Sequence, residues 1–301
     1  MRRMSTRQVI LLTTCLALLA GLSSCLPSKG ISATQTAVTT TVTATVTPPP
    51  SPIPATFTPT PLTCLSLPGL VKQDGVSTTK PPQQFLIYLP PCYENSADAR
   101  FPVLYLLNGL TYNQDQWVRL GAPVIADQLI HSNDALPFII VFPDDRYWNS
   151  EAGPGFGDRL INALIPYVDQ NYRTIADREH RSLGGLSYGG GWTIDLGFKH
   201  PELFGALGLH SPAVFKADAP YVEEIIQTIP LGFHPQVWLD IGDSDKELTN
   251  AILLENILTR NDYLHEFHLF AGDHTENYWS AHVEKYLRWY TQVWQNNSTG
   301  Q

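Results

Sequence analysis

From residue 64 onward, short apolar runs alternate with segments in which apolar residues recur at helical spacing. Residues 101–107 and 138–142 are almost continuously apolar, which is typical of strands buried on both faces of a sheet. Within residues 157–172 the apolar side chains fall on one helical face, at Leu160, Ile161, Leu164, Ile165 and Val168. The pattern predicts an α/β fold with a mostly parallel central sheet and helices on both faces.

The other predicted elements continue this alternation. Further strands are expected at residues 84–89, 181–184, 206–209, 236–241 and 266–270. Helices are expected at residues 122–131, 190–199, 251–260 and 282–295. We find no internal repeat in this series, so we predict a single folded domain over residues 63–297.

Residues 1–24 have the pattern of an export signal. Three arginines precede an apolar run over residues 9–22, which is shorter than the ~20 residues of a membrane-spanning helix. The run leads into Leu22-Ser23-Ser24-Cys25, which resembles the lipobox of bacterial lipoproteins. That resemblance implies cleavage before Cys25, a lipid anchor on its thiol and a place at a membrane surface of the bacterial cell envelope. An ordinary secretory signal with an incidental cysteine is the alternative.

Residues 25–62 are expected to form a tether without a fold of their own. Residues 28–62 consist almost entirely of Thr, Ser, Ala, Val and Pro, a composition that cannot build a hydrophobic core. Repeated proline favours an extended chain, so this segment can span about 100 Å at ~3.1 Å per residue. An anchor followed by such a spacer suggests a domain held away from a membrane.

Charge and cysteine content narrow the class of protein further. The 301 residues carry 19 Lys and Arg against 28 Asp and Glu, a net charge of -9, which argues against a nucleic-acid partner. Hydrophobic residues make up 43% of the chain, as in an ordinary globular protein. Cys64 and Cys92 lie in the predicted domain, where export permits a disulfide between them. Two free buried thiols are the alternative.

The candidate chemistry centres on Gly185-Leu186-Ser187-Tyr188-Gly189, which fits the pattern G-x-S-x-G. The motif lies between a predicted strand and a predicted helix, which is the setting of a nucleophile elbow. A sharp turn there exposes the serine, and the flanking glycines let the chain pass close to it. The helix start also directs N–H groups toward the site. We therefore predict that Ser187 is a nucleophile; a plain glycine-rich turn is the alternative.

A nucleophilic serine needs a base, and on this type of fold the acid and then the histidine follow it along the chain. His274 lies in the turn after the strand at 266–270 and is the predicted base. Asp245 lies past the strand at 236–241, where a loop can reach His274, and is the predicted acid. A metal site built from Asp243 and Asp245 is the alternative for these carboxylates.

Five ordered blocks over about 200 residues make the chain resemble the esterase D and feruloyl esterase group of α/β-hydrolases, which is related to mycolyltransferases and enterochelin esterases. The blocks are residues 105–110, 185–191, 199–204, 242–245 and 272–274. The resemblance implies the α/β-hydrolase fold, Asp245 as acid, His274 as base, and an oxyanion hole formed by the backbone N–H groups of Leu110 and Tyr188. One departure is Asn108-Gly109, where many members carry His-Gly.

These features predict a serine esterase that forms an acyl-enzyme on Ser187 and needs no metal or cofactor. Expected substrates are small acyl, acetyl or feruloyl esters, including carbohydrate-linked ones. The sequence gives no prediction of oligomeric state. Acyl transfer of the mycolyltransferase type, and a non-catalytic carbohydrate-binding lipoprotein on this fold, are the alternatives. Candidate pocket residues lie on or beside the segments near the edge of the predicted sheet where Ser187 is expected: Asn108, Trp117, Trp148, Trp192, His210 and Trp279.

Overall fold

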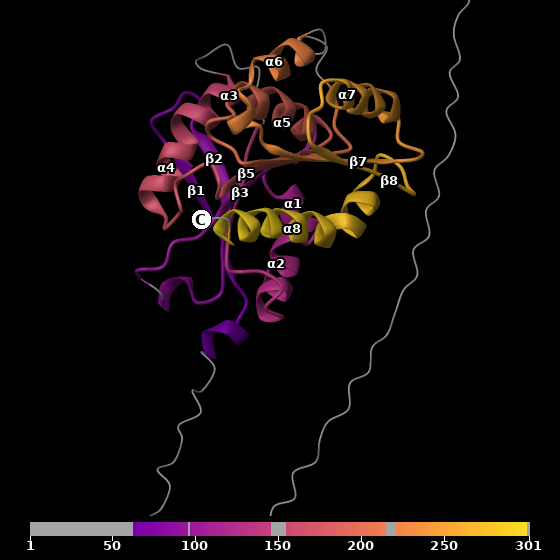
Figure 1. The fold of residues 1–301 in the computed structure, drawn as a ribbon. Helices are drawn as coiled ribbons and strands as arrows, with labels where there is room; N and C mark the ends of the chain where they lie inside the picture. Colours follow the sequence, from indigo (N-terminus) through magenta and orange to yellow (C-terminus); the bar gives the residue numbers. More distant parts are fainter. Residues whose placement is uncertain (1–62, 96, 146–154, 215–220, 300–301) are drawn as a thin grey trace, which may run out of the picture. The chain divides into compact units, whose positions relative to one another are not determined.

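The computed structural model describes residues 63–299, apart from residues 96, 146–154 and 215–220 (Figure 1). Its strands form one sheet in the order β1-β2-β4-β3-β5-β6-β7-β8, in which β1 and β2 pair antiparallel and the strands from β4 to β8 pair parallel. The strands are β1 (Leu70–Val76), β2 (Gln83–Leu89), β3 (Val103–Leu107), β4 (Ile139–Pro143), β5 (Arg181–Leu186), β6 (Ala206–His210), β7 (Gln236–Gly242) and β8 (His265–Phe270). This open, mostly parallel sheet confirms the predicted fold class.

Helices cover both faces of the sheet (Figure 1). One layer contains α3 (Phe156–Arg159), the π-helical segment η3 (Leu160–Leu164), α4 (Ile165–Asn171), α5 (Tyr188–Lys199), α6 (Val222–Thr228) and α7 (Leu248–Arg260). The other contains α1 (Gln116–Arg119), α2 (Ala122–His131) and α8 (Glu276–Thr299). Short 3-10 helices lie at η1 (Thr63–Ser66), η2 (Tyr93–Asn95) and η4 (Leu231–Phe233).

Each face of the sheet has its own hydrophobic core, because successive side chains of a strand point to opposite faces. In β3, Val103 and Tyr105 join the core beneath α3 to α7, whereas Leu104 and Leu106 join the core beneath α2 and α8. All four side chains are at most 1% exposed. The near-continuous apolar runs of the sequence are thus explained by burial on both faces.

The structure differs from the predicted elements in five places. The strand β1 was not expected, because Lys72, Gln73 and Asp74 interrupt its apolar residues and it lies at the exposed edge of the sheet. The short helices α1 and α6 were also not expected. Residues 157–172 are divided between α3, η3 and α4 rather than forming one helix. The last helix begins at Glu276 instead of residue 282, because Tyr278 and Trp279 already belong to its buried face.

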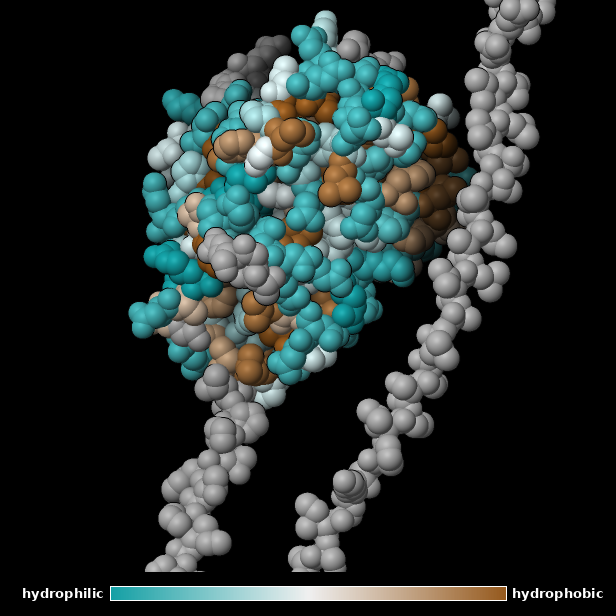
Figure 2. All heavy atoms as spheres, viewed as in Figure 1, coloured by the Kyte–Doolittle hydropathy of each residue, from teal (hydrophilic) through white to brown (hydrophobic). Residues whose placement is uncertain are grey.

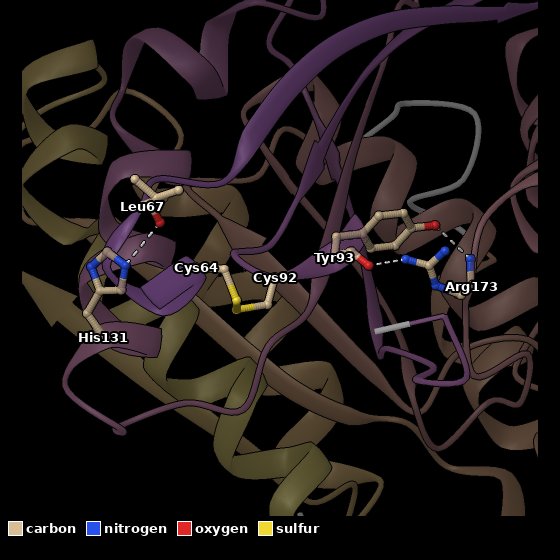
Figure 3. The surroundings of a disulfide bond; sticks show 6 residues. All are labelled: Cys64, Leu67, Cys92, Tyr93, His131 and Arg173. Atoms are coloured by element: carbon tan, nitrogen blue, oxygen red, sulfur yellow. Dashed lines mark hydrogen bonds between the residues drawn. A yellow bond between two sulfur atoms is a disulfide. The ribbon is translucent and has the colours of Figure 1, made fainter. Parts of the chain in front are cut away.

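A disulfide joins Cys64 to Cys92 and ties the start of the described chain to the end of β2 (Figure 3). The Cα atoms of the two residues are 5.1 Å apart. On one side of the bridge, His131 Nε2 lies 3.3 Å from the carbonyl oxygen of Leu67. On the other side, the backbone N–H of Arg173 donates to the Tyr93 hydroxyl at 3.0 Å. The disulfide therefore lies within a segment that further contacts hold to the domain.

The surface drawn in Figure 2 is mostly hydrophilic. A cluster of hydrophobic residues lies on the side where β7 and β8 lie in Figure 1. The elements on that side carry exposed apolar residues: Ile252, Leu253, Leu264 and Leu269. Within the described residues, no helix has both the length and the apolar character that crossing a membrane requires.

Candidate active site

Ser187 lies in a sharp turn between β5 and α5, with the unusual backbone angles φ 52° and ψ -115°. A residue with a side chain rarely adopts a positive φ, and the conformation exposes the hydroxyl at the end of the strand. The neighbouring glycines are required by close packing. A Cβ atom on Gly185 would lie 2.3 Å from the backbone of Gly189, and one on Gly189 would lie 2.3 Å from the carbonyl oxygen of Leu107. The local sequence thus builds a nucleophile elbow.

The structure brings Ser187, His274 and Asp245 together in a hydrogen-bonded series. The Ser187 hydroxyl Oγ lies 2.8 Å from His274 Nε2. His274 Nδ1 lies 2.9 Å from each carboxylate oxygen of Asp245. With the carboxylate on Nδ1, the Nε2 atom is left to accept the serine proton. The indole ring of Trp279 packs edge-on against His274, with ring centres 5.0 Å apart, and limits the orientation of the imidazole.

The loops that carry Asp245 and His274 are tied to each other. The backbone N–H of Gly272 donates to the Asp243 carboxylate at 3.1 Å, and the N–H of Ser244 donates to the Gly272 carbonyl at 2.9 Å. Gly272 has φ 141°, which an ordinary side chain would disfavour. Because these bonds join the ends of β7 and β8, Asp245 and His274 are held at a fixed separation.

Asp245 is set up to remain a carboxylate. Its side chain is fully buried, which by itself raises the pKa of the carboxyl group. Hydrogen bonds from His274 and from the backbone N–H of Glu247, at 2.8 Å, act in the opposite direction. Their sum outweighs burial, so the pKa of Asp245 lies below its usual range. The ionised acid can therefore orient the imidazole and stabilise its charged form.

The expected oxyanion donors both lie in the wall of the cavity that contains Ser187. Tyr188 is the first residue of α5, and the N–H groups of a helix's first turn point out of its end. Leu110 lies in the loop after β3, next to Thr111, which has a strained φ of 73°. Both N–H groups come from segments whose backbone is fixed beside the nucleophile.

Gln116 braces the loop after β3 and was missed in the sequence. Its side chain is fully buried, and its carbonyl oxygen accepts the backbone N–H of Gly109 at 2.8 Å. Its amide nitrogen donates to Glu276 at 3.1 Å, and Glu276 in turn pairs with Arg119. The only available signal was a glutamine a few residues after Asn108-Gly109, which is too common a pattern to interpret.

A cavity of about 640 Å³ opens over Ser187 and His274. Of the candidate pocket residues, Trp279 lines this cavity, and Trp148 lies outside the described residues. Trp192 lines a separate hollow with Asp158 and Asp195. The remaining candidates are core residues rather than parts of the cavity wall: Asn108, Trp117 and His210.

The three buried candidates have structural partners instead. Asn108 donates its amide to the Asp145 carboxylate at 2.8 Å, and the Trp117 indole N–H donates to the Leu107 carbonyl at 2.9 Å. His210 lies 2.7 Å from Asp240. The sequence predicted that these segments lie near the edge of the sheet that carries Ser187. Their side chains, however, point into the core beneath that edge.

The described part of the chain contains no group of three or more His, Cys, Asp or Glu side chains that is arranged to hold a metal ion. Asp243 and Asp245, considered above as metal ligands, have other partners. Asp243 accepts the Gly272 N–H, and Asp245 accepts from His274. In this geometry both carboxylates hold the loop that carries Gly272 and His274 in place.

Fold and site together define an α/β-hydrolase with a serine, histidine and aspartate series at the carboxyl edge of its sheet. The family model described as "Putative esterase" matches residues 77–290, and the chain belongs to this esterase family. The match begins before β2 and ends within α8, and it includes Ser187, Asp245 and His274.

Two curated relatives that are at least 32% identical to the chain match less than half of it. The chain is 36% identical over 140 residues to the endo-1,4-beta-xylanase/feruloyl esterase of Xylanibacter ruminicola, a match covering 43% of this chain and 19% of that protein. It is 32% identical over 143 residues to esterase Rv1288 of Mycobacterium tuberculosis, covering 44% of this chain and 30% of that protein. The matched region therefore spans less than a third of the length of either relative.

Solved structures show the same fold. A ferulic acid esterase superposes with a TM-score of 0.68 at 22% identity, covering 75% of this chain and 99% of that one. The S-formylglutathione hydrolase FrmB of Staphylococcus aureus superposes with a TM-score of 0.59 at 16% identity, covering 74% of this chain and 98% of that one. These likenesses confirm the α/β-hydrolase architecture.

Proposed function

We propose that the protein is a serine esterase that hydrolyses carboxylic esters through an acyl-enzyme on Ser187. The observation that carries this proposal is the 2.8 Å contact between Ser187 Oγ and His274 Nε2, with Asp245 on the other imidazole nitrogen. Membership of the esterase family supports the same reaction.

The reaction follows from this geometry in two steps. His274 Nε2 takes the hydroxyl proton as Ser187 Oγ attacks the ester carbonyl carbon, and the N–H groups of Leu110 and Tyr188 stabilise the oxyanion. His274 then gives the proton to the leaving alcohol oxygen, and the acyl group stays on Ser187. Water attacks this acyl-enzyme with its proton passing to His274, and the acid is released as the proton returns to Ser187.

Within this reaction we propose small acyl, acetyl and feruloyl esters, including carbohydrate-linked ones, as substrates. The cavity offers apolar surface from Leu110, Tyr112 and Trp279, which suits an aryl or short acyl group. Its wall also contains Lys246 and Asn277, which can hydrogen-bond the hydroxyl groups of a sugar. Feruloyl esterase activity in the name of the Xylanibacter relative supports the aryl part of this proposal.

The test compares the purified chain with its Ser187→Ala variant on 4-nitrophenyl acetate and methyl ferulate. We expect turnover in the wild type and a loss of several orders of magnitude in the variant, because the nucleophile is removed. Ser132→Ala, at the end of α2, serves as a matched serine control and should keep full activity. Turnover that survives in Ser187→Ala would refute the proposal, as would failure of a fluorophosphonate probe to label folded wild type.

We also propose that the protein is exported and anchored to a membrane by a lipid on Cys25, with residues 25–62 as a spacer. Supporting this, residues 22–25 resemble a lipobox, and the Cys64–Cys92 disulfide suits an oxidising compartment. We expect Cys25→Ser to move the protein from the membrane fraction to the soluble fraction. Mass spectrometry showing an unmodified Cys25 in membrane-bound wild type would contradict the anchor.

A further inference from the structure

Ser211 directly follows β6 and lies against the nucleophile turn. The carbonyl of the preceding residue, His210, accepts the backbone N–H of Ser187 at 3.0 Å. Ala213 donates its N–H to the Ser187 carbonyl at 2.8 Å, and the Ser211 N–H itself donates to the Asp240 carbonyl at 2.8 Å. Hydrogen bonds thus fix the segment around Ser211 to both the nucleophile turn and β7.

The conformation and burial of Ser211 are unusual for a serine in this position. Its φ is 46°, in the left-handed region that residues with a Cβ atom rarely adopt. The residue is 0% exposed, and its hydroxyl oxygen makes no standard hydrogen bond within the described residues. Strained backbone and an unsatisfied buried hydroxyl both cost stability, and such features are concentrated at functional sites.

Ser211 follows β6 and Asp245 follows the adjacent strand β7, and an interaction with Ser211 is among those that lower the pKa of the Asp245 carboxyl group. Asp245 has one acceptor position to spare. Its Oδ1 accepts from both the Glu247 N–H and His274, whereas the described partner of Oδ2 is His274 alone. A carboxylate oxygen can accept two hydrogen bonds, so Oδ2 has a position left for a donor such as the Ser211 hydroxyl.

We propose that Ser211 is a positioning residue for the catalytic acid, and that its hydroxyl donates to Asp245 Oδ2 when His274 becomes charged during the reaction. The Ser211 proton stays on its own oxygen throughout, and no covalent bond forms or breaks there. The bond holds the carboxylate in the plane of the imidazole at the moment when the attraction between the two groups is largest. This inference rests on the esterase function proposed above.

Two variants separate the hydroxyl from the backbone strain. Ser211→Ala removes the hydroxyl but keeps a Cβ atom at the same positive φ, whereas Ser211→Gly removes the hydroxyl and relieves the strain. With 4-nitrophenyl acetate, we expect kcat to fall about ten- to a hundredfold in both variants, as for loss of a hydrogen bond to an ionised group. KM should stay within about twofold, because Ser211 does not contact the substrate.

Thermal melting distinguishes positioning from a purely structural role. Both variants should melt no lower than wild type, because a buried hydroxyl without a standard partner is removed. Asp262→Gly, which relieves a φ of 51° at a loop before β8, is the matched control for strain relief and should keep wild-type kcat. Unchanged kcat in Ser211→Ala would overturn the proposal, as would a loss confined to Ser211→Gly or one that parallels a fall in melting temperature.

The same assay includes Ser187→Ala as a reference. If Ser187→Ala is inactive while Ser211→Ala has wild-type kcat, the inference about Ser211 fails and the esterase function stands. If Ser187→Ala keeps activity, the proposed function fails first.

Discussion

His210 and Asp240 lie opposite each other on the adjacent parallel strands β6 and β7, and their side chains form a completely buried pair with Nδ1 and Oδ1 2.7 Å apart. Three further donors, Trp238, Tyr278 and Tyr286, reach the same carboxylate at 2.8 Å each. All four acceptor positions of the carboxylate are therefore used. Burial and the nearby charge of Asp240 raise the pKa of both tyrosines, which keeps their hydroxyl groups as donors.

Asp240→Asn should destabilise the protein by about 3–5 kcal/mol, because an amide offers only one acceptor oxygen and places donors against donors in a buried site. The free energy of unfolding in urea measures this loss. Tyr286→Phe removes a single donor and should cost less, about 1–3 kcal/mol. An Asp240→Asn protein as stable as wild type would show that the carboxylate makes no net contribution to the free energy of unfolding.

Gly185 and Gly232 provide a matched pair for testing the nucleophile turn. A Cβ on Gly185 would lie 2.3 Å from the backbone of Gly189, whereas one on Gly232 meets nothing within 4 Å. Gly185→Ala should lower the free energy of unfolding by about 1–3 kcal/mol, because the added methyl group overpacks the turn. It should also lower kcat by more than about tenfold, because Ser187 is displaced. Gly232→Ala should be neutral in both assays, and equal behaviour of the two variants would refute the steric argument.

The order of elements and the position of the site residues on them could be predicted from the sequence. The buried strands have continuous apolar runs, and the motif around Ser187 marks a strand-to-helix turn in any chain that has it. His274 and Asp245 were found because their loops follow β8 and β7, at the edge of the sheet where Ser187 lies. The structure then shows the hydrogen bonds that join them.

Side-chain direction and long-range partners could not be predicted in the same way. Trp117 and His210 lie on segments beside the site, but both point into the core, where their rings are 5.8 Å apart. Gln116 is fully buried and is also held by Glu276, which α8, some 160 residues later, places next to it. Such contacts depend on the tertiary packing of helices on the sheet, which no local pattern encodes.

The Gln116 brace can be tested on catalysis alone. Gln116→Leu removes the acceptor of the Gly109 N–H and loosens the loop that carries Leu110. We expect kcat to fall about tenfold or more with little change in KM, a smaller effect than the ~10²–10³ for deleting an oxyanion donor. Glu276→Gln leaves the acceptor for Gly109 intact and should keep kcat near wild type. An equal loss in both variants would assign the effect to the Arg119–Glu276 contact instead.

The ionisation of Asp245 leads to a prediction about acid pH. Burial raises the pKa of this carboxyl group, but hydrogen bonds from His274 and the Glu247 N–H outweigh it and leave the pKa below the usual value. A group whose folded pKa is depressed contributes stability that is present above its unfolded pKa of about 3.9 and is lost as the pH falls through the folded value. Asp245 should therefore stay ionised down to about pH 4.

The logarithm of kcat/KM should accordingly fall with a slope no steeper than one per pH unit on the acid side, down to about pH 4, because Asp245 takes up no proton there. Initial rates with 4-nitrophenyl acetate, corrected for unfolded protein, measure this slope. The difference in unfolding free energy between wild type and Asp245→Asn should be constant above about pH 5 and shrink below about pH 4. A slope of two above pH ~4, or a difference that grows in acid, would mean that Asp245 takes up a proton in this range and is not held as a carboxylate.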